Sequence, residues 1–243
     1  MNSNLVRTTG ALLVVQGLLL LVPIAILGSA INWPASLSEP PAVVLPLIAE
    51  QASAVRAGYF VYLIFSVLFW PVALLTARVA AGSDELPPLL RIAVGFGIAS
   101  AVARTLGIIR WLVAMPGLAR IYNDPTTPES TRAAVEVTYR ALNDYGGSIG
   151  EVLGVSLFAA LWLVCLSVYA LRHATLPRWS AIAGLFAAAA LFGAIVELFG
   201  IDLGALITVT TSIFQLWMLA LGVSLVLRGG KSQESGVRSQ EFA

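Results

Sequence analysis

Residues 89–115 read LLRIAVGFGIASAVARTLGIIRWLVAM, a mostly apolar run in which three arginines are the only charged residues. The run is long enough to cross a bilayer, because a hydrocarbon core about 30 Å thick needs about 20 residues of helix. Backbone polar groups cannot stay unpaired in lipid, so a segment that spans it must be helical. The sequence contains five further runs of this kind: 10–31, 57–80, 148–171, 179–199 and 203–227. It therefore predicts an all-α integral membrane bundle of six transmembrane helices, a single domain over residues 1–228.

The overall composition supports the same fold class. Hydrophobic residues make up 58% of the 243 positions and charged residues only 11%, whereas a soluble domain carries about 25% charged residues. The net charge of +1 is not that of a nucleic-acid-binding protein. A single cysteine, Cys165, excludes an internal disulfide, and one histidine with one cysteine makes no zinc site. We therefore expect a protein of the lipid bilayer with no metal, no cofactor and no nucleic-acid partner.

The distribution of lysine and arginine predicts how the chain is oriented. If the N-terminus is cytoplasmic, eight basic residues of the loops and ends fall on the cytoplasmic side and four fall outside. This excess follows the positive-inside rule and predicts that both termini are cytoplasmic. Residues 229–243 are rich in glycine, serine, glutamine and charge, which predicts a disordered cytoplasmic tail. On the outside, a short helix is expected over residues 127–145, before the fourth span, with Pro128 and Glu129 in its first turn. It is expected to continue into the fourth span or to lie on the membrane surface before it.

Four charged residues lie within or at the ends of the apolar spans: Arg104, Arg110, Glu151 and Glu197. Charged side chains inside a membrane usually face the interior of the bundle and pair with one another. Helix rise places Arg110, Glu151 and Glu197 about 29 to 32 Å from the basic residues at the cytoplasmic boundary, and Arg104 about 20 Å from it. We therefore predict a polar cluster near the outer face, made by these four residues and joined by Asp144.

Rows of small residues accompany these charges. One row lies in the third span and another opens the fourth: Gly95, Ala99, Ala103 and Gly107, then Gly146, Gly150 and Gly154. Such rows let helix backbones approach closely, and at 100° per residue the charged side chains flank them. Packing the two rows together would therefore bring arginine and glutamate side by side. Three interpretations of the cluster stay open, namely an ion pair that fixes helix register, a ligand or ion site, and hydrated side chains near the interface.

A longer pattern begins at Arg104. Residues 104–154 read RTLGIIRWLVAMPGLARIYNDPTTPESTRAAVEVTYRALNDYGGSIGEVLG, and residues 176–185 read LPRWSAIAGL. This pattern resembles the bacterial domain-of-unknown-function family 4386 over residues 56–227, most specifically in its Arg-Trp before a proline, its Gly-Glu-x-x-Gly and its Leu-Pro-Arg-Trp. The resemblance implies a bacterial inner-membrane protein of six to seven helices. It implies no activity, substrate or cofactor, and so no catalytic residues.

Catalytic motifs are not convincing in this chain. Residues 146–150 (GGSIG) match the nucleophile-elbow pattern, but that pattern needs a strand before the serine and a histidine within reach. The one histidine, His173, falls at the opposite membrane face. We therefore predict a protein that is not an enzyme but a scaffold or regulatory subunit, with a membrane-protein partner or a second copy of itself. The alternative is a small-solute or ion transporter that uses the Arg/Glu cluster; an intramembrane enzyme is a distant third.

Overall fold

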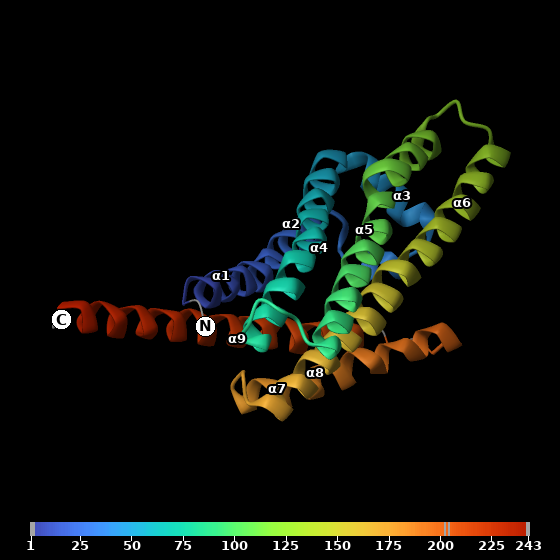
Figure 1. The fold of residues 1–243 in the computed structure, drawn as a ribbon. Coiled ribbons are helices and arrows are strands. Elements are labelled where there is room, and N and C mark those ends of the chain that lie inside the picture. Colours follow the sequence, from blue (N-terminus) through green and yellow to red (C-terminus); the bar gives the residue numbers. More distant parts are fainter. Residues whose placement is uncertain (1–2, 202, 204, 242–243) are drawn as a thin grey trace.

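The computed structural model describes residues 3–201, 203 and 205–241, and Figure 1 shows them as an assembly of helices. Short connections join the helices, and the described residues contain no β-strand. In chain order the elements are α1 (Ser3–Leu19), α2 (Leu21–Ile31), the 3₁₀ helix η1 (Ala35–Ser38), α3 (Pro41–Glu50), α4 (Ala52–Ala81), α5 (Pro88–Asn123), α6 (Glu129–Gly147), the π-helix η2 (Ser148–Ala159), α7 (Ala160–His173), α8 (Arg178–Gly193), the 3₁₀ helix η3 (Ala194–Phe199) and α9 (Ala205–Glu241).

Six helical stretches of the described chain are long and apolar enough to cross a membrane: Ser3–Ile31, Ala52–Ala81, Pro88–Asn123, Glu129–His173, Arg178–Phe199 and Leu206–Gly230. Each overlaps one predicted span, so the all-α membrane fold is confirmed. The first stretch is interrupted at Leu20, three residues before Pro23. Proline has no N–H group, and its ring collides with the carbonyl group four residues earlier, which explains the break.

The structure bears on the expectations for two segments. The outer helix begins at Glu129 and continues into the fourth span, the first of the two expected arrangements, because α6, η2 and α7 follow one another without a break. At the other end of the chain, α9 continues to Glu241 through most of the segment predicted to be a disordered tail, whose last two residues lie outside the described part. Extending an existing helix is easier than starting one, and lysine, glutamine, glutamate and arginine in this segment all have good helix propensity.

Two apolar clusters fill the bundle. The Trp162 core joins α1, α8 and α9 to α7 and to the neighbouring ends of α4 and α5; its rings are Phe69, Trp162, Phe214 and Trp217. The Trp111 core joins α2, α3 and α6 to the other ends of α4 and α5, around Tyr59, Trp111 and Tyr139. Both cores therefore share the two central helices, and the seam between them lies partway along α4 and α5.

The first and last spans close the bundle. A Cβ atom on Gly10 of α1 would lie 2.7 Å from the carbonyl oxygen of Gly222 in α9, and one on Gly229 would lie 3.0 Å from the Cβ of Arg7. Earlier residues of α1 thus meet later residues of α9, so the two helices run antiparallel. Consistently, the two ends of the chain lie on the same side of the bundle in Figure 1, opposite the α5–α6 connection.

Candidate functional site

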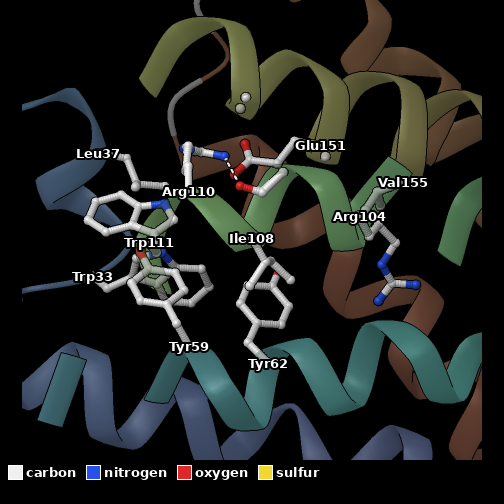
Figure 2. Close-up of a pocket in the computed structure, with 14 residues that line it drawn as sticks. Trp33, Leu37, Tyr59, Tyr62, Arg104, Ile108, Arg110, Trp111, Glu151 and Val155 are labelled. Carbon is white, nitrogen blue, oxygen red and sulfur yellow. Dashed lines mark hydrogen bonds between the residues drawn. The ribbon is translucent and has the colours of Figure 1, made fainter. Parts of the chain in front are cut away.

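A polar pocket lies at the seam, between α4, α5 and η2, with the connection after α2 at its edge (Figure 2). The space open to the centres of water molecules is about 30 Å³, room for about two waters. Side chains that carry charge or aromatic rings make up much of its lining: Trp33, Tyr59, Tyr62, Arg104, Arg110, Trp111 and Glu151. The pocket is therefore small, and it combines two guanidinium groups with one carboxylate.

Close backbone contact between α5 and η2 builds one wall of this pocket. A Cβ atom on Gly107 would lie 2.7 Å from the Cα of Gly150 and 2.9 Å from the carbonyl oxygen of Gly146. The two predicted glycine rows therefore do pack together at this point. Gly95, at the other end of the α5 row, would meet nothing within 4 Å, so the α5 row does not pack closely along its whole length.

Arg104 is the most deeply buried charged side chain of the pocket, with only 5% of its surface exposed. Its Cζ atom lies 4.6 Å from the centroid of the Phe65 ring and 5.1 Å from that of Phe69, a favourable position for a cation over an aromatic face. Its Nε is enclosed and has no hydrogen-bond partner, and none of the hydrogen bonds between described residues involves its guanidinium group. Figure 2 shows this group turned away from Arg110 and Glu151.

The Arg110 side chain, in contrast, bonds to its own helix. Its Nη1 donates to the carbonyl oxygen of Gly107, and its Cζ lies 5.7 Å from the Trp111 ring centroid. Glu151 lines the same pocket, yet no nitrogen–oxygen contact within 4.0 Å joins it to Arg110 in the described residues. The expected side-by-side pair is therefore not a direct ion pair, because Arg110 folds back along its own helix to a backbone carbonyl.

The structure brings three of the five predicted cluster residues to the pocket. Arg104, Arg110 and Glu151 line it, whereas Glu197 and Asp144 do not. Glu197 lies in η3, which packs against η2, and its carboxylate is near enough to interact electrostatically with Glu151. Asp144 is exposed on α6, seven residues before Glu151 and so about 10 Å along the same continuous helix.

The tyrosines of the pocket, Tyr59 and Tyr62, were not predicted from the sequence, and Trp33 and Trp111 were expected only as interfacial or packing aromatics. The Tyr59 ring stacks on Trp111, with centroids 4.5 Å apart and planes 10° apart, and the Trp33 ring meets Tyr62 edge to face at 5.8 Å. The Tyr59 hydroxyl is buried without a partner among the described residues. A usable signal was present, since Tyr59 and Tyr62 are three residues apart and therefore share one face of the second span.

Together the six spans and the buried pocket define a multi-pass helical membrane protein with a polar site inside its bundle. The chain matches the family model described as Domain of unknown function (DUF4386) over residues 9–229. It therefore belongs to this family, which confirms the resemblance and extends it beyond residues 56–227. No curated protein and no solved structure matches the chain.

Proposed function

We propose that this protein acts by binding and not by catalysis, as a regulatory or interaction subunit of the bacterial cytoplasmic membrane whose pocket receives the polar group of a ligand. The supporting observation is Arg104, a buried side chain that lines the pocket and whose Nε has no hydrogen-bond partner among the described residues. A buried charge that lacks an ionic partner costs stability. Charged residues inside membrane spans commonly mark ligand or ion sites. A bound ligand would supply the missing partner of Arg104 and offset this loss of stability.

The proposed orientation determines where the ligand enters. With both termini cytoplasmic, Arg110 lies nineteen residues beyond Arg91 on α5, about 29 Å along the helix axis. The pocket then belongs to the outer half of the bundle. Its ligand would arrive from the extracytoplasmic solution or from the outer leaflet, and binding would be relayed to a membrane-protein partner or to a second copy of the chain.

Transport of a small solute is the second candidate. The pocket extends along α5 from Arg110 to Arg104, six residues or about 9 Å toward the middle of the bundle. One wall is the π-helix η2, and π-helical geometry is frequent at functional sites. The present width admits about two water molecules, so transport would require α5 and η2 to separate.

The full chain, purified in a mild detergent, tests both functions. We expect mass spectrometry of the intact complex to show a bound small molecule, lipid or protein with the wild type, and to show less of it with Arg104→Met. Purified protein that carries nothing, and that binds nothing added back, would contradict the proposal. Flux of the identified ligand into vesicles that contain the protein would favour the transporter instead.

A further inference from the structure

The charges of the pocket leave one cation available to a ligand. Arg110 donates to the Gly107 carbonyl oxygen and shares its end of the pocket with the half-buried Glu151. Arg104 reaches the other way and finds only the faces of Phe65 and Phe69. Two arginines and one glutamate give the pocket a net charge of +1, so one singly charged anion would balance it.

The size of the pocket limits which anions can bind beside Arg104. Room for about two water molecules matches the two oxygens of a carboxylate group. A phosphate group has four oxygens and carries about −1.5 to −2 charge at pH 7, so it exceeds both the space and the available charge. The planar guanidinium fork is also complementary to a carboxylate, which it can bind through two parallel hydrogen bonds.

Aromatic contacts prepare Arg104 for this role. Its guanidinium group lies over two rings of α4, so little further side-chain freedom is lost when an anion binds. The remaining lining is apolar or aromatic at Trp33, Ile108 and Val155. Because the carboxylate group fills the present space, an uncharged hydrocarbon or aromatic body next to it would enter between these side chains as α5 and η2 separate.

From these observations we infer that the ligand presents a single carboxylate group to Arg104, with an apolar body directed toward the Trp33 edge of the pocket. This inference rests on the proposed binding function. The same chemistry occurs in small water-soluble carboxylates and in the head group of a fatty acid that enters from the outer leaflet. The test below separates the two sources.

Thermal unfolding of the full chain in detergent provides the test, because a ligand that binds the folded state raises the melting temperature with its concentration. The probes are sodium benzoate and sodium octanoate, a soluble and an amphiphilic carboxylate. Benzamide, sodium phosphate and sodium chloride at matched ionic strength are the comparisons. We expect at least one carboxylate, and none of the three comparison compounds, to raise the melting temperature; octanoate alone indicates a lipid source, and benzoate alone or both indicates a soluble source.

Variants assign the effect to the pocket. Arg104→Met keeps an unbranched side chain that reaches about as far as Nε and removes the charge, so the variant should fold, and we expect carboxylate binding to weaken about 10- to 100-fold. Arg104→Lys keeps the charge without the fork and should bind with intermediate affinity, which provides a second measurement if the methionine variant fails to fold. Arg120→Gln removes an exposed arginine from the same helix and should bind as the wild type does.

The outcomes separate the two proposals. Equal stabilisation by phosphate, or full carboxylate binding by both Arg104 variants, would overturn the carboxylate inference. So would a co-purified ligand without a carboxylate group, although the binding function would then stand. If no probe binds and no molecule co-purifies, both proposals fail.

Discussion

The two cores of this bundle are each built around a buried tryptophan, but they differ in their relation to the polar pocket. Trp162 and its neighbours Phe69, Phe214 and Trp217 pack edge to face or in stacks within the bundle. None of the buried residues of this core lines the pocket, whereas Trp111 and Tyr59 of the other core do. The difference teaches that the two cores contribute to the site in different ways: the Trp162 core places Phe69 beneath the guanidinium group of Arg104, whereas the Trp111 core lines the pocket itself.

Removing the central ring of the Trp162 core should have the largest effect. Trp162 has none of its surface exposed, and truncating such a residue to alanine costs about 3 to 5 kcal/mol. We expect Trp162→Ala to lower the free energy of unfolding by this amount in a denaturant titration in micelles. Trp70→Ala, at a half-exposed position on α4, is the matched control and should change it little. Similar losses in both variants would contradict the distinction between core and surface.

The seam between the cores should be the next most sensitive place. A methyl group on Gly107 would collide with backbone atoms of η2, and overpacking of this kind costs about 1 to 3 kcal/mol. We expect Gly107→Ala to unfold at lower denaturant concentration, and Gly95→Ala, which meets open space on the same helix, to match the wild type. Equal stability of the two variants would mean that α5 and η2 separate easily.

Tyr59 tests whether the Trp111 core is built for stability alone. Its hydroxyl group is buried without a partner among the described residues, and a buried polar group in that condition is costly. We expect Tyr59→Phe to raise the free energy of unfolding by about 1 kcal/mol. Tyr169→Phe, in the Trp162 core, serves as its counterpart and should have little effect. A clear loss of stability in Tyr59→Phe would show that the hydroxyl group contributes to packing after all.

The smallest expected effect lies outside both cores, in the α5–α6 connection. The hydroxyl and backbone N–H groups of Thr126 donate to the Asp124 carboxylate and hold its pKa below the usual range. Because the folded-state pKa is lowered, this contribution is present above the ordinary aspartate pKa of about 4 and is lost as the pH falls through the lower folded value.

Hydrogen exchange of residues 120–130 can measure this effect, with wild type and Thr126→Ala compared at the same pH. We expect the wild type to be better protected at pH 6 and the difference to shrink toward pH 3. Thr138→Ala, which removes an exposed hydroxyl from α6, should show no such pH dependence. A difference that stays constant with pH would exclude the carboxylate as its source.

Sequence reasoning could predict the spans and one of the helix contacts. Length and hydropathy identify the six helices, and the glycine rows identify the contact of α5 with η2. Helical periodicity fixes the face on which Arg104 lies, but a long side chain can still turn along its helix or across it. For this reason the contact of Arg104 with Phe65 and Phe69 could not be foreseen, nor could the turn of Arg110 back to a backbone carbonyl.

Two further features escaped prediction for different reasons. The π-helical winding of η2 could not be recognised from the sequence, because the periodicity that identifies helices assumes the α-helical turn of 100° per residue. The contact of α1 with α9 did leave a mark, since Gly10 and Gly17 are seven residues apart and so are Gly222 and Gly229. Equal glycine spacing at two distant places in a chain is compatible with many helix pairings, so it does not by itself identify α1 and α9 as partners.

The contact of α1 with α9 has a consequence for how the protein assembles in the membrane. The α9 helix begins about 200 residues after the start of α1, and synthesis at about 5 to 20 residues per second separates the two by roughly 10 to 40 s. During this interval the glycine face of α1 is without α9, which will later pack against it. Assembly therefore includes a waiting period in the membrane, and the contact of α1 forms only when α9 arrives.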